Sequence, residues 1–146
     1  MGGLLQRSGE RLSSGRPVMW ADDIATGQTV RLDLPRGSGA RACLLDPDAL
    51  AQVACLLQNA TDAGPDLIVV NRFGHAESEG HGLRPEIAAA IFSGAAVLIA
   101  VRDTRLDDLH AFLGGTGALL PLTPDAIADW AEHAAAVRQP AVPGHW

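Results

Sequence analysis

The chain has 146 residues, of which 47% are hydrophobic, and this is enough to bury one core without disulfide or metal cross-links. Its formal net charge is -6, and all eleven basic residues are arginine. The acidic balance argues against nucleic acid and anionic membranes as general partners.

The composition also argues against membrane insertion. The longest apolar stretch, residues 95–101, is far shorter than the roughly 20 residues that cross a bilayer. The two cysteines, Cys43 and Cys55, do not have metal-binding spacing, and the first residues do not resemble a secretion signal. We therefore expect a cytoplasmic protein.

The first 42 residues predict strands. Residues 2–5 form a short apolar run, which fits either an edge strand or a start that lacks preceding elements. Residues 30–34 alternate between apolar and polar, as in a half-exposed strand, and residues 18–21 are expected to pair with them in a hairpin. A glycine-rich connection is expected over residues 35–41.

From Asp46 onward, helical patterns alternate with buried strands. Asp46 is a good N-cap and Pro47 fits the first helical position, so a helix is predicted to begin there. Residues 67–70 form an uninterrupted apolar run, typical of a strand that is buried on both faces of a parallel sheet. Pro85 predicts the start of a second helix, which Gly94 ends.

The alternation continues toward the C-terminus. Residues 96–101 predict a second buried strand, and the leucines within residues 106–113 have helical spacing. Residues 118–120 fit a third strand, and Thr123 followed by Pro124 predicts the start of a last helix.

These patterns predict a single α/β domain over residues 1–138. Residues 1–42 form its strand and hairpin region, and residues 43–138 form the alternating region. The expected architecture has three layers around a mostly parallel sheet, and residues 139–146 are expected to be a loose tail.

The polar loop predicted after the first buried strand, over residues 71–84, is the main candidate site. Ligands of open α/β sheets bind beyond the carboxyl ends of the strands. A loop that is merely solvated is the alternative. The candidate ligand-binding residues lie in this loop or just after the next strand: Asn71, Arg72, Phe73, Gly74, Glu77, Glu79, Arg84 and Arg102.

A divalent metal site is a second hypothesis for the same loop. His75, Glu77, Glu79 and His81 occupy every second position, so an extended loop would direct all four to one side. Imidazole and carboxylate groups together can hold a metal. The opposing interpretation is a solvated acidic loop, because no helical motif such as H-E-x-x-H is present.

Arginines follow both predicted buried strands. Arg72 and Arg102 are placed to flank an anion, and the helix that starts at Pro85 offers backbone amides nearby. The sequence equally allows each arginine to pair with a carboxylate such as Asp66 or Asp103.

The usual catalytic and nucleotide-binding motifs are absent. The chain has no G-x-x-x-x-G-K-[ST] loop, no lysine, no dinucleotide fingerprint and no G-x-S-x-G turn. The tryptophans are too dispersed to form a base-stacking platform, and Trp20 and Trp130 are expected to pack in the core.

Three segments resemble an uncharacterised bacterial family, domain of unknown function 2478, whose genes are often found beside molybdate transport genes. They are GGLLQ at residues 2–6, CLLDPDAL at residues 43–50 and DLIVVNRFGHAESEGHGLRPEI at residues 66–87. The pattern NRFG-x-x-E-x-EG-x-G-x-R in the last segment is the most specific part of the resemblance.

The family is distantly similar to small P-loop nucleoside-triphosphatases, which implies a degenerate version of that fold. In this comparison residues 67–70 correspond to the Walker B strand, which acidic residues follow in active enzymes. Asn71 and Arg72 stand in those positions here, so ordinary triphosphate hydrolysis is not expected. Family members also have a strand and a helix before GGLLQ, and this chain is expected to lack them.

The resemblance implies a non-catalytic or weakly catalytic accessory protein in molybdenum or tungsten uptake or use. Its expected ligand is a nucleotide or an anion such as molybdate or tungstate, and a protein partner in molybdenum metabolism and a homo-oligomer are further expectations. Two alternatives stay open: a metal-dependent enzyme that uses the loop of residues 71–84, and an interaction module for a transporter or cofactor-assembly protein.

Overall fold

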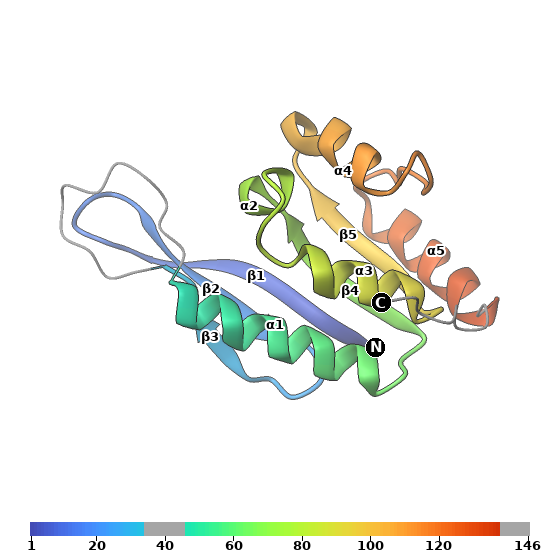
Figure 1. The fold of residues 1–146 in the computed structure, drawn as a ribbon, viewed down its shortest axis with the longest axis horizontal. Coiled ribbons are helices and arrows are strands. Elements are labelled where there is room, and N and C mark those ends of the chain that lie inside the picture. Colours follow the sequence, from blue (N-terminus) through green and yellow to red (C-terminus); the bar gives the residue numbers. More distant parts are fainter. Residues whose placement is uncertain (34–45, 138–146) are drawn as a thin grey trace.

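The computed structural model describes residues 1–33 and 46–137. The interpretations of residues 35–41, of Cys43 and of the tail from residue 139 lie outside this part of the chain. The described residues form an α/β fold around one five-stranded sheet, in the order β3-β2-β1-β4-β5 (Figure 1). None of the helices found in these residues is long and apolar enough to cross a membrane.

The described residues contain strands, helices and one 3-10 helix. The strands are β1 (Gly2–Arg11), β2 (Pro17–Asp23), β3 (Thr29–Arg31), β4 (Leu67–Phe73) and β5 (Ala96–Val101). The helices are α1 (Pro47–Asp62), α2 (His75–Ser78), α3 (Arg84–Phe92), α4 (Leu106–Phe112) and α5 (Pro124–Ala136), and the 3-10 helix η1 (Asp103–Arg105) precedes α4.

The sheet is mixed, which corrects the prediction of a mostly parallel sheet. β1 pairs antiparallel with β2 and parallel with β4, β2 pairs antiparallel with β3, and β4 pairs parallel with β5. β1 is therefore the central strand, and an edge position for residues 2–5 is wrong. The predicted hairpin is confirmed, with Ala21 opposite Val30.

Local capping fixes the helix starts as the sequence predicts. The Asp46 side chain accepts a hydrogen bond from the backbone N–H of Asp48 at 2.9 Å, at the start of α1. The Thr123 hydroxyl accepts from the backbone N–H of Ala126 at 3.3 Å, at the start of α5. These side chains satisfy backbone donors that have no partner within the helix.

The main core lies between the sheet and the helices α1 and α3. Leu57 of α1, Ile87 of α3, and Ile68 and Val70 of β4 are fully buried there. Leu67 and the other alternate residues of β4 point to the opposite face, where α5 packs against β4 and β5 (Figure 1). Helices therefore cover both faces of the β4–β5 half of the sheet.

The sheet ends at β5, which corrects two expectations. β5 has the predicted bounds, but its residues are only half-buried or exposed because it is an edge strand. Residues 118–120 form no strand, and Leu119 is 72% exposed. An apolar run becomes a strand only where its backbone meets a partner, and this segment passes the sheet without pairing.

Asp33 joins the end of β3 to β2. Its carboxylate accepts hydrogen bonds from Nη2 of Arg31 at 3.0 Å and from the backbone N–H of Met19 at 3.0 Å. The hydrogen bonds lower the pKa of Asp33 below its ordinary 3.8, and Arg31 makes the largest contribution.

We expect Asp33→Asn to destabilise the fold at neutral pH and to have no effect in strong acid. A carboxyl with a lowered folded-state pKa stabilises the fold above its unfolded pKa near 3.8, and this contribution disappears as the pH falls through the folded value. Urea unfolding of both proteins from neutral pH to the lowest pH at which they fold measures the difference. A difference that does not change with pH would contradict the assignment.

Candidate functional site

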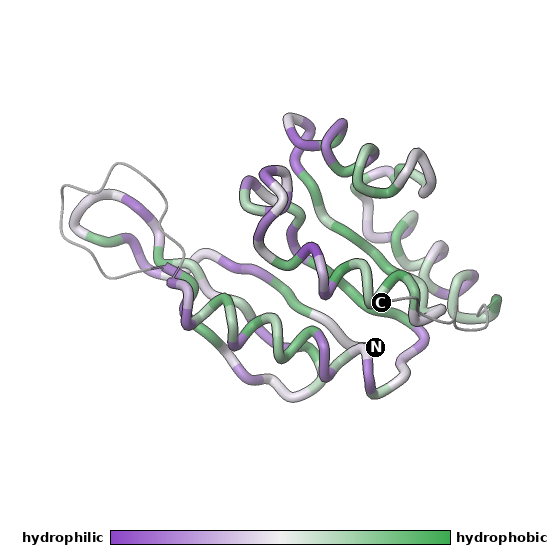
Figure 2. The backbone as a smooth tube through the Cα atoms, viewed as in Figure 1, coloured by the Kyte–Doolittle hydropathy of each residue, from purple (hydrophilic) through white to green (hydrophobic). Residues whose placement is uncertain are grey.

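The candidate site lies where the parallel strands β4 and β5 end. α2 follows β4 and η1 follows β5, and both lie beyond the carboxyl ends of these strands (Figure 1). In Figure 2 the strand β5 is hydrophobic along nearly its whole length, whereas hydrophilic segments gather beyond it. This is the edge at which open α/β sheets bind their ligands.

β4 continues further into the predicted polar loop than the sequence suggests. Asn71 lies opposite Ala100 of β5 and Phe73 lies opposite Val101, so Arg72 is an extra residue in the β4 ladder. The polar loop therefore begins at Gly74. Such an irregularity redirects the side chain of the extra residue.

Phe73 is a core residue and has no surface for a ligand. It is 1% exposed, and its ring centroid lies 5.7 Å from that of Phe112 in α4. The Arg84 guanidinium lies over the Phe112 ring, with its central carbon 4.8 Å from the ring centroid. Arg84 thus contributes a cation–π contact between the start of α3 and α4.

Glu77 holds the loop together. Its carboxylate is buried and accepts hydrogen bonds from the backbone N–H of Gly74 at 2.9 Å and of Leu83 at 3.0 Å. One oxygen serves each donor, so the carboxylate links the end of β4 to the start of α3. Both oxygens are thereby hydrogen-bonded to the backbone, and the side chain points into the loop.

Gly82 makes room for this carboxylate. It has φ +65°, a conformation that favours glycine, and a Cβ there would collide with Oε1 and Cδ of Glu77. Packing within the loop therefore explains Glu77 and Gly82 of the NRFG-x-x-E-x-EG-x-G-x-R pattern.

The predicted metal ligands are not directed to one side. Residues 75–78 form the short helix α2 rather than an extended segment, so the premise of alternating side chains is wrong. His75 and Glu79 are exposed and 3.9 Å apart, while Glu77 points inward to the backbone. Within residues 1–33 and 46–137, no group of three or more His, Cys, Asp or Glu side chains is arranged to hold a metal ion.

Arg72 and Arg102 lie close enough for their positive charges to interact. Burial lowers the pKa of the half-buried Arg72 guanidinium, and the positive charge of Arg102 lowers it further. The ion pairs between described residues do not include Arg72 or Arg102, so a pairing of either with Asp103 is not seen. Two neighbouring guanidinium groups present N–H donors and unbalanced positive charge.

A contact that the sequence did not suggest joins the two loops around these arginines. Arg105 of η1 lies 3.0 Å from Nδ1 of His75 in α2, and it also contacts Asp108 at 3.8 Å. The ring nitrogen accepts the hydrogen bond in its neutral state. Arg105 lies three positions after Arg102 in the sequence. This short spacing is the sequence feature from which a position of Arg105 near the end of β5 could have been predicted.

We predict that Glu77→Ala destabilises the protein by about 2–4 kcal/mol, because it leaves two backbone donors without their acceptor. Gly82→Ala is also destabilising, since the new methyl group meets the carboxylate and the backbone is strained. Chemical denaturation of the two single variants and of the double variant measures both effects.

The two substitutions should not be additive. Removal of the carboxylate relieves the collision, so Gly82→Ala should cost less in the Glu77→Ala background than in the unchanged protein. Additive losses would show that Gly82 is needed for its backbone conformation alone.

Residues 1–130 match the family described as "Protein of unknown function (DUF2478)", and the chain belongs to this family. A similar curated protein is the molybdenum import ATP-binding protein ModC 2 of Bradyrhizobium diazoefficiens, which is 38% identical over 130 residues. The match covers 89% of this chain but 14% of the relative, so the chain spans about one seventh of that protein's length. No solved structure matches the chain.

Proposed function

We propose that the chain is a non-catalytic accessory domain that binds a small oxyanion, or the phosphate of a nucleotide, between Arg72 and Arg102. The domain would serve molybdenum or tungsten uptake or use. The observation that carries the proposal is a pair of neighbouring guanidinium groups, at the ligand-binding edge of an α/β sheet, without a carboxylate partner among the described residues.

The electrostatics of this pair favour an anion. Burial makes the positive charge of Arg72 less favourable, and the nearby charge of Arg102 adds to that cost. An anion placed between them reverses the sign of the interaction and accepts charge-assisted hydrogen bonds from both. Arginine stays protonated throughout the physiological pH range, so the site would keep its charge.

The residues around the pair support binding rather than hydrolysis. Asn71 and Arg72 occupy the end of β4, where a Walker B strand would be followed by acids. Glu77, a buried acid in the loop after β4, accepts a backbone N–H hydrogen bond with each of its oxygens. A carboxylate in that state is not placed to hold magnesium or to activate water.

The link to molybdenum rests on the similar protein and on anion chemistry. The relative is named as a molybdenum import ATP-binding protein. Molybdate and tungstate are tetrahedral oxyanions, and their oxygens accept hydrogen bonds from guanidinium groups as phosphate oxygens do.

We expect Arg72→Gln and Arg102→Gln each to weaken anion binding by about tenfold or more, the size of a lost hydrogen bond to a charged group. Isothermal titration with molybdate, tungstate, sulfate and ATP measures this. Arg11→Gln is the matched control, because Arg11 is an exposed arginine in β1 whose Nη1 donates to the Gly15 carbonyl.

Saturable binding that both variants weaken and the control preserves would support the proposal. No binding of any of the four anions to the folded chain would overturn it. Binding that is equally strong in all variants would place the anion elsewhere and would also overturn it.

A further inference from the structure

A row of three side chains crosses the other half of the sheet. In the strand register, Trp20 of β2 lies opposite Arg7 of β1 and Arg31 of β3. The neighbouring pair Ala21 and Val30 belongs to the core. Because side chains alternate between faces, the row lies on the face that points away from the core.

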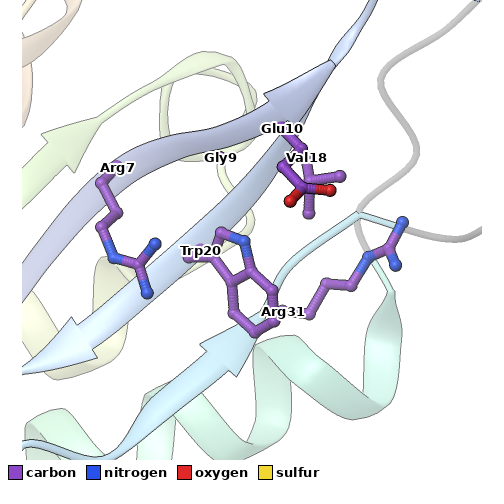
Figure 3. Close-up of a pocket in the computed structure, with 6 residues that line it drawn as sticks. All are labelled: Arg7, Gly9, Glu10, Val18, Trp20 and Arg31. Atoms are coloured by element: carbon purple, nitrogen blue, oxygen red, sulfur yellow. The ribbon is translucent and has the colours of Figure 1, made fainter. Parts of the chain in front are cut away.

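This row lines an open hollow of about 340 Å³. The Trp20 ring occupies its middle, with Arg7 on one side, Arg31 on the other and the carboxylate of Glu10 nearby (Figure 3). A Cβ at Gly9 would lie 2.7 Å from Nε1 of Trp20, so the glycine lets the indole approach β1. The described residues that line the hollow are Arg7, Gly9, Glu10, Val18, Trp20 and Arg31.

Both arginines are held in place by aspartates. Nε of Arg7 donates to Asp22 at 2.7 Å, and the guanidinium carbon lies 5.4 Å from the Trp20 ring centroid. Arg31 donates to Asp33 through Nε at 3.2 Å and Nη2 at 3.0 Å. These bonds leave both terminal nitrogens of Arg7 and Nη1 of Arg31 without an acceptor in the described part of the chain.

The indole N–H of Trp20 likewise has no acceptor among residues 1–33 and 46–137. The hollow thus offers N–H donors from three residues, the carboxylate of Glu10 and the apolar surface of the indole, whereas Val18 is buried. Asp22 and Asp33 already balance the arginines, so the hollow has no surplus positive charge for a polyanion. A small ligand with one negative and one positive group matches this arrangement better.

We propose that the hollow binds a small zwitterion of the α-amino acid type. The ligand's carboxylate accepts hydrogen bonds from Arg31, and its ammonium group pairs with Glu10. An apolar or aromatic side chain of the ligand packs on the indole, which Arg7 holds from the other side. The fixed orientation of the two arginines lowers the entropic cost of binding. This site is separate from the arginine pair at the ends of β4 and β5.

Nuclear magnetic resonance of the indole N–H groups tests the proposal on the full chain. The chain has three tryptophans, and replacement of each by phenylalanine assigns its signal. The probes are phenylalanine, 3-phenylpropanoate, which lacks the ammonium group, and 2-phenylethylamine, which lacks the carboxylate. We expect phenylalanine to shift the Trp20 signal saturably and to bind more tightly than either fragment, while the Trp130 and Trp146 signals stay in place.

Glu10→Gln provides the sharpest variant, because Glu10 is exposed and the substitution keeps its size. It should weaken phenylalanine binding about fivefold, as expected for the loss of a partly exposed ion pair, and should strengthen binding of 3-phenylpropanoate. Arg31→Gln should weaken both. Arg72→Gln is the control and should leave the affinities for phenylalanine and 3-phenylpropanoate unchanged. The experiment therefore tests this site independently of the proposed anion site.

Two results would overturn the proposal. One is the absence of a saturable Trp20 shift with all three probes. The other is a Glu10→Gln variant that binds phenylalanine and 3-phenylpropanoate with the same relative affinity as the unchanged protein. The dispersion of the backbone amide signals shows in each variant that the fold is retained.

Discussion

The buried carboxylate of Glu77 is the contact on which the candidate site depends. It spans the connection from β4 to α3 by accepting from Gly74 and Leu83, and Gly82 leaves the space that it occupies. A buried charge is tolerated because both oxygens are hydrogen-bonded. The loop is therefore tied at both ends, directly after the β4 residue Arg72.

This constraint changes the meaning of the most specific sequence pattern. Glutamates and glycines in a polar loop suggest ligand binding. Here, however, Glu77 accepts hydrogen bonds from backbone N–H groups, and Gly82 is needed because a Cβ there would collide with Glu77. Phe73 belongs to the core in the same way. The anion site that we propose uses instead the pair Arg72 and Arg102, which forms no ion pair with a carboxylate among the described residues.

The features that follow from local chemistry could be predicted from the sequence. Asp46 and Thr123 mark helix starts because a side chain next to its own backbone makes the cap. The apolar run at residues 67–70 also predicts a strand, and it forms one because β1 and β5 supply pairing partners on its two sides. The extension of β4 through Arg72 could not be predicted, because polar residues enter a strand only when a distant partner, here β5, supplies the ladder. The alignment of Arg7, Trp20 and Arg31 also depends on register, so Trp20 was wrongly expected in the core.

The central position of β1 also sets the order in which the sheet can assemble. The β1–β2–β3 hairpins join residues that are close along the chain, whereas the parallel pairing of β1 with β4 joins Gly2 to Ile68. Closing such a long loop costs more entropy than closing a hairpin. The antiparallel half can therefore form without the parallel pairing of β1 with β4. The two arginines come together through a different connection, the crossover from β4 to β5, which joins Leu67 to Ala96.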